Sequence, residues 1–215
     1  MGKFSNGIFG NFYGKIGNVV GSSWRGIDYL KSLPKINKNR IPSQLQIEQQ
    51  QRFSLMTAFM NLLRPLLSAG YKNQAIRATA YNVALSENIK NAIAGAYPEF
   101  VVDFPEVILS SGVLPLPTNL AVAAAAGLKV DFSWTDNSGK GKSLKTDKVF
   151  TLAFCPELDE AEYTLGDASR EAGALSMVLP AEWEGKDVET YLFLVSVTGK
   201  EVTRTYYGGR VTIIA

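Results

Sequence analysis

The run ETYLFLVSV, residues 189–197, predicts a strand at the centre of a β-sheet. Tyr191, Phe193 and Val195 alternate along it with Leu192 and Leu194. Because successive side chains of a strand point to opposite faces of the sheet, both faces of this strand carry apolar side chains. We therefore expect the strand to be central and buried on both sides.

Further runs of β type surround this strand in the C-terminal half of the chain. They are rich in β-branched and aromatic residues, and turn signals separate them. Their number and spacing predict a seven-stranded, immunoglobulin-like β-sandwich over residues 97–215. The candidate strands are 100–104, 106–112, 125–134, 148–155, 174–180, 189–197 and 203–215.

The segment before the sandwich, residues 42–96, is expected to form a helical hairpin. Ser43 followed by Gln46 has the pattern of a capping box, and apolar residues then recur at steps of three or four. Pro65 should kink or end the first helix. The second helix is predicted over residues 73–94.

The chain begins with a segment rich in glycine and aromatic residues, GIFGNFYGKIGNVVGSSWRGIDYLKSLP, residues 7–34. Its β-branched and aromatic content predicts a β-hairpin, with Gly21-Ser22-Ser23 near the tip. Residues 1–41 would then be an extended arm and linker, and the whole chain an α+β protein. Two strands alone are marginally stable in water, so we expect this arm to need another surface to lie on.

The glycines of the arm do not fit a phosphate-binding loop. Gly14-Lys15 is followed by Ile16, and Gly10 stands too close for the spacing G-x-x-x-x-G-K-[ST]. The G-x-G-x-x-G pattern of dinucleotide-binding folds is absent as well. We therefore expect no cofactor.

The sequence has no histidine and a single cysteine, Cys155. The first absence excludes Ser-His and Cys-His catalysis, and zinc would have to be held by carboxylates and one thiolate. Cys155 lies in the apolar run VFTLAFC, which favours a buried side chain over a nucleophile. We predict neither an enzyme nor a metal site, and the absence of long apolar runs predicts no membrane insertion.

Charge is unevenly divided along the chain. Residues 1–91 hold 12 Lys or Arg and only three Asp or Glu, whereas the remainder holds 10 basic and 17 acidic residues. A basic segment with interleaved aromatics can bind nucleic acid. It can also dock on the acidic part of another copy, which is the reading we favour.

The opening of the chain resembles an uncharacterised protein family found in Bacteroidota genomes and their phages. The resemblance is carried by G-x-x-G-N-x-x-G-K-x-G-x-V-V-G-x-x-W-R-G-x-x-Y-L-K-S-L-P and by P-S-Q-L-x-x-x-Q-Q-x-R-F, which opens the first helix. It covers residues 7–95, and the sandwich only by pattern. The same opening is similar to that of certain phage virion proteins. The resemblance implies no catalytic residue.

Together these features predict a structural, self-assembling protein, most simply a virion component (head decoration, connector or tail part) made in the bacterial host cytoplasm. Its partners would be other copies of itself and other particle proteins. The alternative is a host-surface module that binds a glycan or protein through the sandwich loops around Thr135–Lys145 and Glu182–Lys186. The residues expected at the subunit interface are Phe12, Lys15, Val20, Trp24, Arg25, Tyr29 and Lys31.

Overall fold

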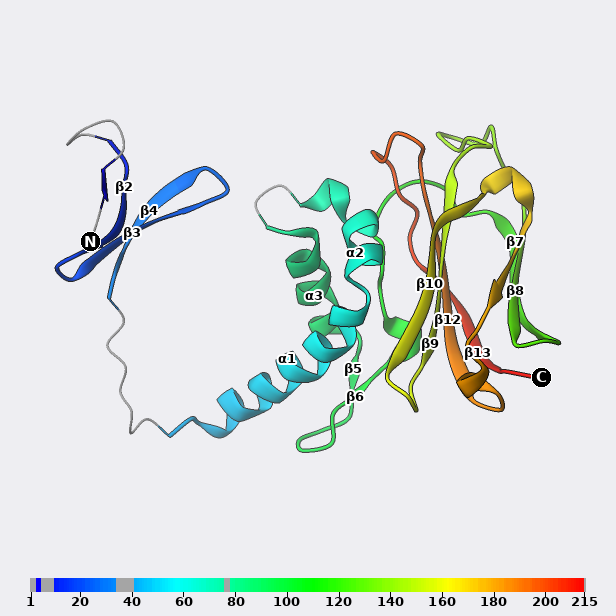
Figure 1. The fold of residues 1–215 in the computed structure, drawn as a ribbon, viewed down its shortest axis with the longest axis horizontal. Coiled ribbons are helices and arrows are strands. Elements are labelled where there is room, and N and C mark those ends of the chain that lie inside the picture. Colours follow the sequence, from blue (N-terminus) through cyan, green and yellow to red (C-terminus); the bar gives the residue numbers. More distant parts are fainter. Residues whose placement is uncertain (1–2, 5–9, 34–40, 76–77, 215) are drawn as a thin grey trace. The chain divides into compact units, whose positions relative to one another are not determined.

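The computed structural model describes residues 3–4, 10–33, 41–75 and 78–214. The chain divides into two compact units, which we call unit 1 (Met1–Ser43) and unit 2 (Gln44–Ala215). The helical hairpin and the sandwich expected from the sequence thus lie together in unit 2 (Figure 1).

Unit 1 is an antiparallel sheet of four strands in the order β1-β2-β3-β4. Two-residue turns join β2 to β3 and β3 to β4. The second turn, Arg25-Gly26, has positive φ at both residues, as a type I′ turn requires. The strands are β1 Lys3–Phe4, β2 Phe12–Ile16, β3 Val19–Trp24 and β4 Ile27–Ser32.

The hairpin tip predicted at Gly21-Ser22-Ser23 was wrong, because these residues lie in the middle of β3. A glycine is needed at position 21 because the backbone of a neighbouring strand comes close to it, and not because the chain turns there. A Cβ added there would lie 2.0 Å from the carbonyl oxygen of Phe12 on the neighbouring strand. The glycine therefore lets the backbone at the start of β2 lie against β3.

The helices of unit 2 are shorter than the sequence predicted. Pro65 stands in the first turn of α2, so the expected break after the first helix is confirmed. The last helix begins only after Thr79, whose side chain accepts a hydrogen bond from the backbone N–H of Asn82 at 3.1 Å. The helices are α1 Gln44–Leu62, α2 Arg64–Gly70 and α3 Ala80–Asn91, with a 3₁₀ turn η1 at Lys72–Gln74.

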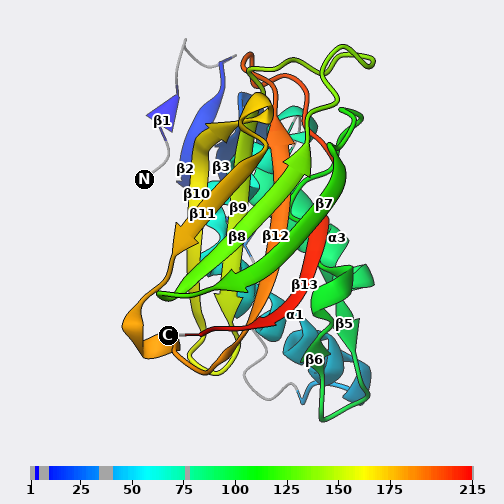
Figure 2. The same cartoon turned by 90° about the vertical axis from the view of Figure 1, so that its right-hand side faces the viewer.

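Seven strands of unit 2 form two antiparallel sheets, of which one has the order β10-β9-β12-β13 and the other β11-β8-β7 (Figure 2). The mixed α+β class with antiparallel sheets is therefore confirmed. A short ribbon of β5 Ile93–Ala94 and β6 Val101–Val102 follows α3. The strands of the two sheets are β7 Thr118–Ala125, β8 Lys129–Thr135, β9 Lys148–Cys155, β10 Glu160–Ser169, β11 Ala174–Val178, β12 Asp187–Val195 and β13 Tyr206–Thr212.

Two hydrophobic cores share the four-stranded sheet. One core lies between the two sheets and includes Phe132 of β8 and Leu192 and Leu194 of β12. The other lies between the helices and the outer face of the sheet, and includes Phe59 and Phe193. Figure 1 shows the resulting three layers, helices, sheet and sheet. The prediction that β12 is central and buried on both faces is confirmed.

Two of the candidate strands were assigned wrongly. Of the run 100–104, only Val101 and Val102 pair, in the β5–β6 ribbon, and 106–112 forms no strand. In the run 106–112, side chains take the place of a neighbouring strand as hydrogen-bond partners of the backbone. Asn88 exchanges two hydrogen bonds of 2.8 Å with the backbone of Ile108, and the hydroxyl of Thr205 accepts from the next two N–H groups.

Two strands were missed. β7 is rich in alanine and β10 begins with acidic residues, and both residue types are depleted in strands. Both lie at sheet edges, where one side of the strand makes no ladder hydrogen bonds. The strand pattern is weakest at such positions.

Replacing Asn88 tests the support of the irregular run. Asn88→Leu preserves the size of the side chain but leaves the N–H of Ile108 without its partner and removes the shorter of the two hydrogen bonds to its C=O, so the free energy of unfolding should fall by about 1–3 kcal/mol. Urea denaturation of the full chain measures this loss. Asn82→Leu, on the exposed side of the same helix, is the control, and an equal effect of both variants would contradict the argument.

Gly21→Ala tests the close approach of β2 to β3. The new methyl group would collide with the Phe12 carbonyl, which is backbone and cannot rotate away. We expect the amides of β2 and β3 to exchange hydrogen much faster than in the control variant Ser22→Ala, while the amides of unit 2 keep their protection. Unchanged protection in Gly21→Ala would show that β2 can move aside at no cost.

Candidate functional site

The register of the sheet in unit 1 brings most of the predicted interface residues to one face. Val20 pairs with both Lys15 and Lys31, and Trp24 pairs with Ile27. Directly paired residues share a face, and every second residue of a strand returns to it. We call this surface the tryptophan face. It consists of Lys15, Val20, Ser22, Trp24, Ile27, Tyr29 and Lys31.

Two of the predicted interface residues do not belong to the tryptophan face. Phe12 lies against Gly21, whose missing Cβ would point to the opposite side of the sheet. Arg25 stands in the turn between β3 and β4. Sequence reasoning also missed Ile27, although the two-residue turn places it directly opposite Trp24.

The tryptophan face is apolar and exposed towards the β3–β4 turn, at the end away from Lys15 and Lys31. Trp24 is 51% exposed, Ile27 61% and Tyr29 42%. Among the described residues of unit 1, Gly21 alone is buried. The described residues of this sheet therefore form no hydrophobic core, and contiguous exposed apolar side chains mark a surface that other molecules cover.

Hydrogen bonds across the sheet of unit 1 support its shape. Asp28 accepts hydrogen bonds from the side chains of Asn11 and Tyr13, the latter at 3.0 Å, so β4 is tied to the start of β2. The bond to the Asp28 carboxylate raises the pKa of the Tyr13 phenol. These contacts are exposed to water, so they hold the strands together only weakly.

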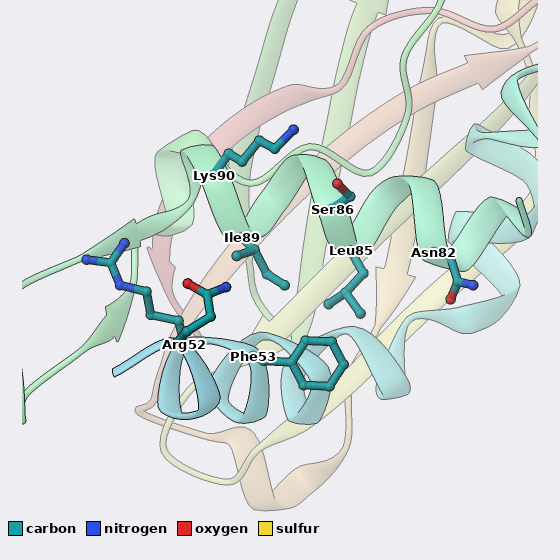
Figure 3. A pocket seen from close by; sticks show the side chains of 8 residues that line it. Arg52, Phe53, Asn82, Leu85, Ser86, Ile89 and Lys90 are labelled. Atoms are coloured by element: carbon teal, nitrogen blue, oxygen red, sulfur yellow. The ribbon is translucent and has the colours of Figure 1, made fainter. Parts of the chain in front are cut away.

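A groove lies between α1 and α3 of unit 2, with a volume of about 740 Å³. Figure 3 shows Leu85 and Ile89 of α3 and Phe53 of α1 lining it between the two helices. Arg52 and Lys90 make its rim basic. We call it the helical groove. Its lining residues are Gln49, Arg52, Phe53, Asn82, Leu85, Ser86, Ile89 and Lys90.

A second groove, of about 520 Å³, is almost wholly apolar. Its aromatic lining is built on Phe59 and Phe154, whose rings make an edge contact with centroids 4.9 Å apart. Leu62 and Val101 leave 39% and 56% of their surfaces exposed beside these rings. We call it the apolar groove. Its lining residues are Leu55, Ala58, Phe59, Leu62, Phe100, Val101, Val102, Phe104, Phe154, Pro156 and Asp159.

The two loops considered for ligand binding lie at opposite ends of the three-stranded sheet. Thr135 ends β8 close to the start of β11, whereas the segment Glu182–Lys186 follows β11 at its other end. One small ligand therefore cannot contact both loops, because antiparallel pairing separates them by the length of the strands.

Buried hydrogen bonds hold the loop that follows Thr135. Arg170 is fully buried and donates from Nε to Asp147 Oδ2 at 3.1 Å and from Nη2 to the carbonyl of Pro115 at 3.0 Å. It also donates to the side chain of Asn137. This buried network holds a surface loop in one conformation.

The buried tyrosines of unit 2 have structural roles. Tyr71 donates to Glu87 Oε2 at 2.6 Å, and burial followed by this bond raises the pKa of its phenol. Burial and the bond to Glu189 raise the pKa of Tyr207 to about 12. Each hydroxyl donates to a glutamate side chain and so ties two elements of unit 2 together. Among the described residues, no three carboxylate or cysteine side chains are grouped closely enough to hold a metal ion.

None of the described helices is long and apolar enough to cross a membrane.

Comparisons with known proteins come from three sources. The solved structures similar to this chain include the FN1-FN3 domains of chicken CNTN1, at 9% identity and a TM-score of 0.32, with coverage of 49% of this chain and 34% of that one. They also include the fn3 domain of the human collagen alpha-1(XX) chain, at 18% identity and a TM-score of 0.32, with coverage of 49% and 90%. This chain thus spans about a third of the CNTN1 fragment.

A search of curated proteins found no match. The model of DUF6266, a family of unknown function, matches residues 11–209, and the chain belongs to this family.

Proposed function

We propose that this chain is a structural protein that assembles with copies of itself through unit 1. The observation that carries the proposal is a sheet with an exposed apolar face whose described residues form no buried core. Such a sheet gains stability when a partner covers it. The virion is the proposed location, as head decoration, connector or tail part, because the opening of the sequence is similar to that of certain phage virion proteins.

The tryptophan face offers apolar surface for association. Complete burial of an exposed side chain of this kind is worth roughly 1.5–3 kcal/mol, and Trp24, Ile27 and Tyr29 can contribute the part that belongs to their exposed 51%, 61% and 42%. Aromatic side chains at the centre of an interface commonly supply most of its binding energy. Lys15 and Lys31 lie at one end of the face and add a charged border.

The opposite net charges of the two units favour contacts between unit 1 of one copy and unit 2 of a neighbouring copy. Residues 1–43 hold seven Lys or Arg and one acidic residue, whereas residues 44–215 hold 15 basic and 19 acidic residues. Unit 1 is therefore positive and unit 2 negative. Complementary charge raises the rate of encounter and rejects wrong pairings.

Nucleic acid is the other partner that a basic, aromatic face fits. Phosphate contacts by several Lys and Arg side chains would make binding fall steeply between 50 and 200 mM salt. Apolar self-association depends much less on salt. The exposed apolar surface of Trp24, Ile27 and Tyr29 outweighs the two lysines of the face, so we favour the protein partner.

Removing the apolar anchors should dissociate the assembly. We expect Trp24→Ser combined with Tyr29→Ser to lower the mass of the purified full-length protein, measured by sedimentation at 150 mM salt, to that of a monomer, because the centre of the interface is lost. Unit 2, which contains both hydrophobic cores, should keep its secondary structure.

The matched control is Leu30→Ser on the opposite face of the same strand, where the side chain is 64% exposed. It should leave the mass unchanged. If the double variant keeps the mass of the unaltered protein, or if that protein is itself a monomer, unit 1 does not assemble the chain.

A further inference from the structure

We propose that the tryptophan face of one copy docks in the apolar groove of unit 2 of a second copy. This inference rests on the proposed function, and adds to it the site that receives unit 1. It follows from three observations on the groove: its aromatic lining, its acidic surroundings and its contrast with the helical groove.

The lining of the apolar groove suits aromatic anchors. Phe59 makes edge contacts with Phe154 and Phe104, with ring centroids 4.9 and 6.0 Å apart. Phe59 and Phe154 keep only 6% and 2% of their surfaces exposed, so an incoming indole or phenol ring would meet chiefly the partly exposed rings of Phe100 and Phe104. The exposed parts of Leu62 and Val101 would be covered at the same time. Apolar surface would thus be removed from water on both partners.

One carboxylate lines the apolar groove, and two others are next to lining residues in the sequence. Asp159 lines it, Glu99 directly precedes the lining residue Phe100, and Glu157 directly follows Pro156. Glu99 and Asp159 face water. Lys15 and Lys31 beside the apolar part of the tryptophan face provide the opposite charge.

Two cations near the groove are already engaged. Lys186 donates to Glu157 Oε2 at 2.8 Å. The Arg52 guanidinium lies over one face of the Phe100 ring, 4.6 Å from its centroid. Glu99 and Asp159 therefore remain as the negative charges available to an incoming lysine.

The helical groove does not fit the same partner. Lys90 and Arg52 line it, the latter also bordering the apolar groove through Phe100, and none of its lining residues is a carboxylate. Docking unit 1 there would bring like charges together, which costs binding energy. The apolar groove is therefore the site that the charges of unit 1 select.

Single lysine substitutions in the full-length chain test the proposal. Val101→Lys places a cation in the apolar groove and should raise the dissociation constant of the assembly about tenfold or more, measured by sedimentation over a range of concentrations. Val178→Lys, on an exposed strand of the three-stranded sheet with 67% of the side chain exposed, is the matched control and should change it less than about twofold. Ser86→Lys makes the equivalent test of the helical groove.

Charge reversal provides a second and independent measurement. Lys15→Glu with Lys31→Glu should weaken self-association, and so should Glu99→Lys with Asp159→Lys. Mixing these two variant proteins restores attraction between the face of the first and the groove of the second, so the mixture should associate more strongly than either protein alone.

Each other outcome has a defined meaning. If Val101→Lys leaves the assembly intact while Trp24→Ser with Tyr29→Ser dissociates it, the proposed function stands and the docking site is elsewhere. Weakening by Ser86→Lys alone would assign the site to the helical groove.

If Val101→Lys changes the emission of Trp24 but not the mass, unit 1 docks within its own chain and the second copy is excluded. If no variant changes the mass, the proposed function also fails.

Discussion

The architecture of unit 2 depends on one constraint, the apolar character of both faces of β9 and β12. Along β12, Tyr191 and Phe193 face the helices, whereas Leu192 and Leu194 face the second sheet. A sheet of this kind is stable only when a layer covers each face. The helices are therefore not an appendage of the sandwich. They complete it, and this explains why residues 44–215 form one compact unit.

Unit 1 presents the opposite condition, a sheet that no layer of its own covers. Its described residues bury only Gly21, and that burial comes from the close approach of the start of β2 to β3. Main-chain hydrogen bonds and the turns hold its shape, but hydrogen bonds exposed to water add little stability. In the proposed assembly, a neighbouring copy supplies the missing layer. The same physical requirement is thus met within the chain in unit 2 and between chains in unit 1.

Strands that are buried on two faces could be predicted from the sequence, and so could the α+β class. β9 and β12 have continuous apolar runs, whereas the acidic residues of β10 and the alanines of β7 hid two edge strands. Five of the interface candidates share one face because strands alternate with period two. Phe12 departs from it because the start of β2 lies against β3 at Gly21, a contact that no local pattern encodes. The apolar groove combines residues from α1, β6 and the end of β9, so only the fold reveals it.

The division of charge has a consequence for the geometry of assembly. Like charges oppose pairing of unit 1 with unit 1 and of unit 2 with unit 2, so they favour contacts between unlike units even where each ion pair adds little affinity. A contact between two different surfaces of identical chains is heterologous. Two copies can exchange such contacts mutually in a closed dimer, or each copy can pass the contact on to the next in a ring or an open helical filament. In the proposed assembly, the uncovered basic sheet and the acidic apolar groove let each copy contact a neighbour through either surface.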